Sequence, residues 1–158
     1  MNNIWKYSLV LAFSIIIDQL VKGTAQSLIV NEGGVVSLLG PLNFVRIRNE
    51  ELIFGLSLPF FNTYANTFAI VICTFLIFLC LKKIVHFRNR SPITGWAYTL
   101  LLTGLFTSWL DRVSQGFTLG YLGLSLGEST LVPFSIGDIY FFLGIISVVI
   151  FELRGRLS

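Results

Sequence analysis

Residues 60–81 have the sequence FFNTYANTFAIVICTFLIFLCL, a run of 22 residues without a charged side chain. As an α-helix this run rises roughly 33 Å, close to the ~30 Å hydrocarbon thickness of a bilayer. Three more apolar stretches, at 4–21, 93–110 and 134–151, are also long enough to span a membrane. The sequence therefore predicts an integral membrane protein, mainly α-helical, with four transmembrane helices.

The composition agrees with a membrane protein. Hydrophobic residues make up 54% of the chain and charged residues only 12%, whereas a soluble domain has about 25% charged residues. The 158 residues leave little room beyond the four spans, so we expect a single membrane-embedded domain over 1–158. The sequence pI near 9.1 would suit a nucleic-acid-binding protein. Because the basic residues gather near the ends of the predicted spans, no nucleic-acid partner is expected.

The basic residues are divided unequally between the two sides of the predicted membrane. One side holds seven of them: Lys6, Lys82, Lys83, Arg88, Arg90, Arg154 and Arg156. The other side holds four: Lys22, Arg46, Arg48 and Arg112. Because basic residues accumulate on the cytoplasmic side, both termini and the 82–92 loop are expected in the cytoplasm. A cleaved signal peptide at 4–21 is the alternative, but the apolar run ends at Asp18 without a small-residue cleavage pattern.

The segment between the first two spans, 23–59, has the pattern of a small β-sheet on the outer membrane surface. Residues 27–30 and 35–39 are predicted strands, and Asn-Glu-Gly-Gly at 31–34 between them is typical of a turn. Residues 43–48 alternate apolar and basic side chains, as a strand with two different faces does. The second outer segment, 112–133, is rich in Gly, Leu and Ser, and its residues leave open whether it forms a short interfacial helix or a lid.

Two aspartates, Asp111 and Asp138, stand at the outer ends of the third and fourth predicted spans. An ionised side chain at the centre of a bilayer costs roughly 2.5–3.5 kcal/mol on insertion scales, so such residues usually serve a function. Antiparallel neighbouring helices would bring both carboxyls to a similar depth, and two carboxyls that share a proton are suited to activating water. A structural role for both, as helix caps or interfacial acids, is the alternative.

Other catalytic chemistries find little support in the sequence. His86 is the only histidine and lies in the basic loop, so neither a multi-histidine metal site nor a Ser-His-Asp triad is expected. The two cysteines are seven residues apart on one helical face, where packing is the simplest interpretation. A Ser-Lys dyad of Lys22 with Ser108 or Ser114 would leave the two aspartates unexplained. We therefore expect no metal and no cofactor.

Further polar residues lie at the same outer ends. Asp18 and Lys22 are four apart in the first span and can pair on one helical face. That pair is either an ion pair that reaches the interface or part of a site. Asn49 follows the alternating strand, and Arg112 follows Asp111 directly. Taken singly, Asn49 is typical of a turn and Arg112 of an interfacial anchor.

Four short motifs follow one another along the chain. They are Asp-Gln-Leu-Val-Lys at 18–22, Leu-Asn-Phe-Val-Arg-Ile-Arg-Asn at 42–49 with Phe-Gly-Leu at 54–56, Leu-Asp-Arg-Val at 110–113 with Gly116, and Phe-Ser-Ile-Gly-Asp at 134–138. They resemble D-Q-x-x-K, L-N-x-x-x-x-x-N followed by F-G or F-S, N-x-x-D-R-x-x-x-G and F-N-x-A-D. In this order, over nearly the whole chain, the motifs are similar to those of the lipoprotein signal peptidase (signal peptidase II) family.

The resemblance implies a bacterial aspartic endopeptidase of the cytoplasmic (inner) membrane, with four transmembrane helices, a small outer β-cradle and a short outer-surface helix. Such an enzyme removes the signal peptide of a prolipoprotein and cleaves before a cysteine that already carries diacylglycerol. The resemblance implies that Asp111 and Asp138 form the catalytic pair at the outer leaflet. The polar residues implied to orient this pair are Asp18, Lys22, Asn49 and Arg112. The expected partners are the prolipoprotein and membrane lipids, and the expected state is a monomer.

The chain departs from the family pattern near both aspartates. Thr-Ser at 107–108 stands where the family has Gly-Asn, and Ser135 and Gly137 stand where it has Asn and Ala. The V-V-D-F box reads Thr-Leu-Gly-Tyr at 118–121, so Gly120 replaces its Asp. Serine is shorter than asparagine and has one donor fewer. We therefore expect a divergent member or a paralogue in which Ser108 and Ser135 support the aspartates.

The expected mechanism is acid–base hydrolysis. One ionised aspartate takes a proton from water, and the other, protonated, donates to the scissile carbonyl oxygen, which gives a tetrahedral diol without a covalent enzyme intermediate. Two other classes remain open. The first is a non-catalytic member that binds lipoprotein precursors or lipid, and the second is a small ion or proton pathway. The sequence places no ionisable residue deep toward the cytoplasmic side, which argues against the pathway.

Overall fold

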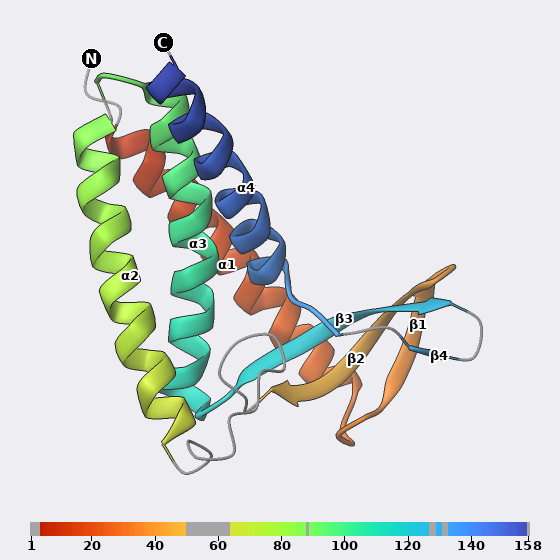
Figure 1. The fold of residues 1–158 in the computed structure, drawn as a ribbon. Helices are drawn as coiled ribbons and strands as arrows, with labels where there is room; N and C mark the ends of the chain where they lie inside the picture. Colours follow the sequence, from red (N-terminus) through yellow and green to blue (C-terminus); the bar gives the residue numbers. More distant parts are fainter. Residues whose placement is uncertain (1–3, 50–63, 88, 127–128, 131–132, 158) are drawn as a thin grey trace.

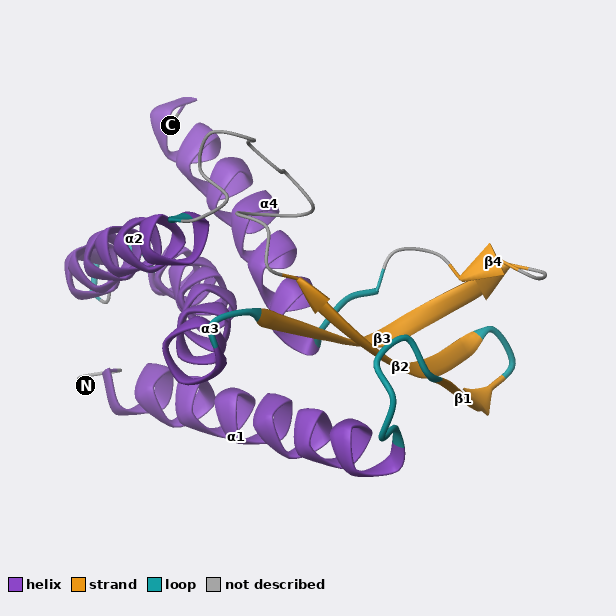
Figure 2. Ribbon diagram, turned by 90° about the horizontal axis from the view of Figure 1, so that it is seen from below, coloured by secondary structure: helices purple, strands orange, loops and turns teal. Residues whose placement is uncertain are grey.

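The computed structural model describes residues 4–49, 64–87, 89–126, 129–130 and 133–157. Four long helices form a bundle: α1 (Ile4–Leu28), α2 (Ala65–Phe87), α3 (Pro92–Gln115) and α4 (Ile136–Leu157). The start of α1 and the end of α4 lie at one end of the bundle, and a small sheet extends sideways from the other end (Figure 1 and Figure 2). Residues 60–63 of the second predicted span and the motif at 54–56 lie outside the described residues.

Three of the described helices, α1, α2 and residues 136–154 of α4, are long and apolar enough to cross a membrane. These helices carry large apolar side chains on their outer surfaces, such as Phe13, Phe75 and Ile146. An apolar surface of this extent is typical of a protein that lies in lipid. The prediction of membrane-spanning helices is therefore confirmed for three of the four stretches, and α3 is not among these three.

Helix α3 is the inner helix of the bundle and contacts each of the other three. Half of its 24 residues are buried, and several of these are small or polar. The buried hydroxyls of Thr99 and Thr103 donate to backbone carbonyls one turn earlier, so they need no partner outside the helix. A Cβ atom at Gly104 would lie 2.5 Å from the backbone nitrogen of Phe141, which shows how closely α3 approaches α4.

The sheet is antiparallel, with strands in the order β1 (Val35–Leu39), β2 (Leu42–Asn49), β3 (Thr118–Leu126) and β4 (Ser129–Thr130). The strands predicted at 35–39 and 43–48 are confirmed, and Gly40 allows the turn between them at a φ of 56°. The second outer segment, 112–133, was expected to form a surface helix or a lid. Most of its described residues form the strand β3 instead. Alternate β3 residues, Leu119 and Tyr121, pack beside Ala25 of α1.

Helix α1 is longer than the sequence predicted. The expected strand at 27–30 is wrong, because Ser27 and Leu28 form the last turn of α1. Beyond this turn, Ile29 is buried at 4% exposure and continues the helical hydrogen-bond pattern to Ala25. The Arg46 side chain of β2 donates to the carbonyls of Ile29 and Val30 and so caps the helix end. The short apolar run at 27–30 is compatible with either structure, and this tertiary contact favours the helix.

Candidate active site

Three charged side chains form a buried cluster where α1 meets α3. The Lys22 ammonium lies 2.5 Å from Asp18 Oδ2 and 2.7 Å from Asp111 Oδ2. Asp18, Lys22 and Asp111 are 0%, 3% and 2% exposed. The predicted pairing of Asp18 with Lys22 is confirmed, but the interfacial interpretation of that pair is wrong because neither side chain reaches the surface. One cation between two carboxylates leaves the cluster with a formal charge of −1.

Both oxygens of Asp111 accept hydrogen bonds. Gln19 Nε2 donates to Oδ1 at 3.1 Å, and Lys22 Nζ donates to Oδ2. Gln19 is half-buried and forms the open side of this arrangement. Gln19 was not among the expected site residues, although it belongs to the Asp-Gln-x-x-Lys motif and is three residues from Lys22, on the same side of the helix.

The second oxygen of Asp18 links the cluster to α4 and β3. Asp18 Oδ1 accepts the Tyr121 hydroxyl at 2.9 Å and the backbone N–H of Gly137 at 3.1 Å. An anionic oxygen at the first turn of a helix meets free N–H groups and the positive end of the helix dipole. Asp18 is therefore shared between an ion pair with Lys22 and the beginning of α4.

Asp138 forms a capping box at the start of α4. Its Oδ2 accepts the backbone N–H of Ser135 at 2.7 Å and the Ser135 hydroxyl at 2.8 Å, and its own N–H points to Ser135 Oγ at 3.1 Å. Asp138 is half-buried, and its Oδ1 accepts no hydrogen bond from the described part of the chain. A capping role is thus present, and one carboxylate oxygen is left for other contacts.

The structure joins the two expected catalytic residues only indirectly. Asp111 and Asp138 share no hydrogen bond; the connection between them runs from Asp111 through Lys22 and Asp18 to the first turn of α4. Tyr121 adds a second route, because its hydroxyl contacts both Asp18 and the N–H of Ile136. Tyr121 was missed from the sequence, where only its place on the buried face of an alternating strand could have indicated it.

Burial and charge keep the Tyr121 hydroxyl protonated. Its side chain is 0% exposed. Burial raises the pKa of Tyr121, and the negative charges of Asp18 and Asp138 add to this rise. The phenol is therefore a hydrogen-bond donor to Asp18 over the whole physiological pH range.

The remaining predicted residues take different positions. Arg112 is 3% exposed, so it is not an interfacial anchor. Its guanidinium interacts electrostatically with Cys73 on α2. Asn49 ends β2, where its carbonyl accepts the Thr118 hydroxyl at 3.3 Å. Ser108 is half-buried and makes no hydrogen bond to a described residue through its hydroxyl. Of these three residues, Arg112 has an electrostatic interaction with the cluster, through Asp111.

Two departures from the family pattern meet in space. A Cβ atom at Gly137 would lie 2.2 Å from Thr107 Oγ1 and 3.2 Å from Thr107 Cβ. The resemblance puts Gly at position 107 and Ala at position 137. Compared with that pattern, this chain has a larger side chain at 107 on α3 and a smaller one at 137 on α4. The absence of a side chain at 137 makes room for Thr107, while the Gly137 N–H stays bonded to Asp18.

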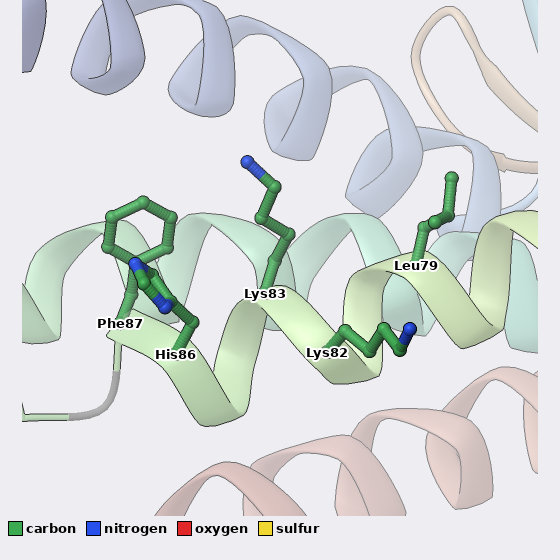
Figure 3. Close-up of a pocket in the computed structure, with 5 residues that line it drawn as sticks. All are labelled: Leu79, Lys82, Lys83, His86 and Phe87. Atoms are coloured by element: carbon green, nitrogen blue, oxygen red, sulfur yellow. The ribbon is translucent and has the colours of Figure 1, made fainter.

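The described residues around the cluster do not form the Ser-Lys dyad that the sequence left as an alternative. Lys22 contacts two carboxylates, and Ser114 Oγ bonds the carbonyls of Leu110 and Asp111, so no Ser-Lys dyad forms between them. Among the described residues no three His, Cys, Asp or Glu side chains gather in a way that could hold a metal. A surface groove of about 350 Å³ lies along α2, lined by Leu79, Lys82, Lys83, His86 and Phe87 (Figure 3). The groove lies in the second half of α2, whereas Asn66 at the start of α2 donates to the carbonyl of Arg112, the residue after Asp111.

Comparisons with known proteins agree with the resemblance. The family described as Signal peptidase (SPase) II matches residues 10–154. The lipoprotein signal peptidase of Thermodesulfovibrio yellowstonii is 24% identical over 151 residues, which cover 96% of this chain and 97% of that protein. The lipoprotein signal peptidase of Bartonella henselae is 23% identical over 122 residues, which cover 77% of this chain and 72% of that protein.

Two solved structures share the fold. Both are described as bacterial membrane enzymes solved by the in meso method, one at 2.3 Å and one at 1.9 Å resolution. Each has a TM-score of 0.77, at 22% and 21% identity. The first comparison covers 97% of this chain and 90% of the other, and the second covers 98% of both. Because the family match extends over nearly the whole chain, this protein belongs to the signal peptidase II family.

Proposed function

We propose that this chain is a bacterial membrane peptidase that removes signal peptides from prolipoproteins. The observation that carries this proposal is the match to the family over 10–154, together with a buried acidic cluster beside the start of α4. The relative from Thermodesulfovibrio, which aligns along nearly its whole length, is named a lipoprotein signal peptidase. By the same reasoning, cleavage before a diacylglyceryl cysteine is the proposed reaction.

The proposed catalytic groups are the carboxyls of Asp111 and Asp138. In the proposed resting state one of the two carboxyls is ionised and the other is protonated, and we assign the role of base to Asp111, whose Oδ2 lies 2.7 Å from the Lys22 ammonium. Asp111 then takes a proton from water, and Asp138 donates its proton to the scissile carbonyl oxygen, which gives a tetrahedral diol. When the diol collapses, the C–N bond breaks, Asp111 gives its proton to the leaving amine, and one diol hydroxyl returns a proton to Asp138, so both carboxyls regain their starting states. The half-buried Gln19 amide donates to Asp111 Oδ1, the oxygen of Asp111 that Lys22 does not contact.

The proposed membrane arrangement follows from the bundle. Helix α3 would be the fourth span, enclosed by the three apolar helices, and 1–158 would form one domain. The start of α1 and the end of α4 share one end, so an even number of spans would put both termini on one side of the membrane, and the excess of basic residues there favours the cytoplasm. The acidic cluster would then lie near the outer leaflet. A monomer with lipid-facing apolar helices can receive a signal-peptide helix and two acyl chains sideways from the bilayer.

Processing of a diacylglyceryl prolipoprotein by the purified protein in detergent tests the proposal. Wild type is expected to convert the precursor to a faster-migrating product on a gel, and Asp111→Asn and Asp138→Asn are each expected to abolish the conversion. Glu152→Gln is the matched control, because Glu152 is a carboxylate on α4 whose partners include Lys83 on α2 and the Tyr98 hydroxyl on α3, away from the acidic cluster. Full activity of either aspartate variant would exclude that residue from the reaction.

A second candidate is a non-catalytic member that binds lipoprotein precursors. The observation in its favour is that Lys22 and Gln19 occupy both oxygens of a nearly fully buried Asp111, while Gly120 replaces the aspartate of the family's V-V-D-F box. This candidate predicts saturable binding of the precursor by wild type with no product at any enzyme concentration. Product formation that depends on Asp138 would exclude it.

A further inference from the structure

The N–H groups at the start of α4 are held by three different side chains. The N–H of Ile136 donates to the Tyr121 hydroxyl at 2.9 Å, that of Gly137 to Asp18 at 3.1 Å, and that of Asp138 to Ser135. Helix ends leave such groups without partners inside the helix. Two of the three partners here come from other elements, β3 and α1, so the direction in which α4 begins is set by tertiary contacts.

Tyr121 is the residue that ties these elements together. Its hydroxyl accepts from Ile136 and donates to Asp18 Oδ1, the same oxygen that accepts from Gly137. Its ring lies under the Lys22 ammonium, 5.9 Å from the ring centroid, and its side chain is fully buried. The backbone takes part as well, because the N–H groups of Tyr121 and Leu122 both donate to the carbonyl of Phe134.

The hydroxyl is a feature of this chain, because the family's V-V-D-F box has phenylalanine at the position of Tyr121. The residue before it differs too, with Gly120 in place of the aspartate of the box. Gly120 and Tyr121 lie on opposite faces of β3, and a Cβ atom at 120 would lie 2.9 Å from Pro133 Cβ. Position 120 therefore has little room for a side chain, whereas position 121 carries a polar contact that phenylalanine cannot make.

We propose that Tyr121 is a positioning residue that fixes the first turn of α4, and with it Asp138, against the Asp18–Lys22–Asp111 cluster. This inference rests on the proposed peptidase function for its effect on rate. Without the hydroxyl, the Ile136 N–H loses its acceptor and Asp18 loses one donor, so the start of α4 is held by fewer contacts. A displacement near 1 Å between reacting groups lowers rates by roughly 100-fold.

Tyr121→Phe tests the inference, because it removes one oxygen and keeps the ring. The expected result in the prolipoprotein assay is a decrease in kcat of roughly 10- to 100-fold, with KM changed less than about threefold. The matched control is Tyr7→Phe. Tyr7 is also buried, at 3% exposure, and its hydroxyl donates to the Pro92 carbonyl at 3.3 Å, at the other end of the bundle. This control is expected to leave kcat and KM unchanged, which separates positioning from the general loss of a buried hydroxyl.

Hydrogen exchange gives a readout that does not need activity. In Tyr121→Phe, the amides of Ile136 and Gly137 are expected to exchange about five- to tenfold faster than in wild type and in Tyr7→Phe. If wild type cleaves and Tyr121→Phe keeps its kcat within twofold, the positioning role is overturned. If wild type cleaves no precursor, the proposed function fails, and the exchange rates alone decide whether Tyr121 holds α4. Unchanged exchange in that case overturns the inference as well.

Discussion

Replacing Lys22 by methionine removes the only cation of the acidic cluster and keeps most of the aliphatic side chain. The ammonium lies 2.5 Å and 2.7 Å from two carboxylate oxygens, and the Lys22 side chain is 4% exposed. At an effective dielectric constant near 20, each contact contributes roughly 6 kcal/mol before desolvation. Desolvation offsets much of this, and removing one partner of a buried ion pair typically costs about 3–5 kcal/mol. We expect Lys22→Met to lower the free energy of unfolding by about that amount.

Equilibrium unfolding in detergent micelles, followed by circular dichroism against increasing SDS, measures this loss. The matched control is Lys83→Met, because Lys83 pairs with Glu152 at 3.0 Å but its side chain is 47% exposed. An exposed pair contributes about 0–1 kcal/mol, so the control should lose no more than that. Adding Asp111→Asn to Lys22→Met should recover part of the stability, since one uncompensated charge disappears. A loss under about 1 kcal/mol for Lys22→Met, or one equal to that of Lys83→Met, would refute the buried, ionised cluster.

Two further substitutions probe the contacts of α4. Gly104→Ala puts a methyl group 2.5 Å from the α4 backbone and is expected to lower the free energy of unfolding by about 1–3 kcal/mol, measured in the same SDS titration. Gly23→Ala on α1, where nothing lies within 4 Å of the added Cβ, should instead stabilise by up to about 1 kcal/mol; equal effects would contradict the close α3–α4 approach. Ser135→Ala removes half of the capping box around Asp138 and should cost about 1 kcal/mol, with faster amide exchange at 138 as its local sign. Unaltered exchange there would show that the box does not hold the helix start.

Three of the helices and two of the strands could be predicted because their signals are local. Long apolar runs specify α1, α2 and α4, and the alternating pattern specifies the 43–48 strand. The turn at 31–34 does precede the 35–39 strand, but the hairpin expected there is wrong, because 35–39 pairs with β2. The pair of Asp18 and Lys22 is likewise set by a spacing of four residues. The sequence also placed Asp111 and Asp138 at the same end of the bundle as this pair.

The long-range contacts could not be predicted from the sequence. Lys22 and Asp111 are 89 residues apart, and Tyr121 and Asp18 are 103 apart, so no periodicity connects them. The strand β3 contains two glycines, which weaken a strand signal, and it forms because β2 offers it a partner edge. The close contact between Thr107 and Gly137 depends on how α3 and α4 pack against each other, which the sequence does not show.

The inner position of α3 bears on how the chain enters the membrane during synthesis. Translation proceeds from the N-terminus, so α3 leaves the ribosome when α1 and α2 exist and α4 does not. Its threonines, its glycines and the Asp111–Arg112 pair partition poorly into lipid compared with the apolar residues of its neighbours. Until α4 is made, the face of α3 around Gly104 lacks the helix that covers it. In the proposed four-span arrangement, α4 would thus act as an internal insertion partner that retains α3 in the bilayer.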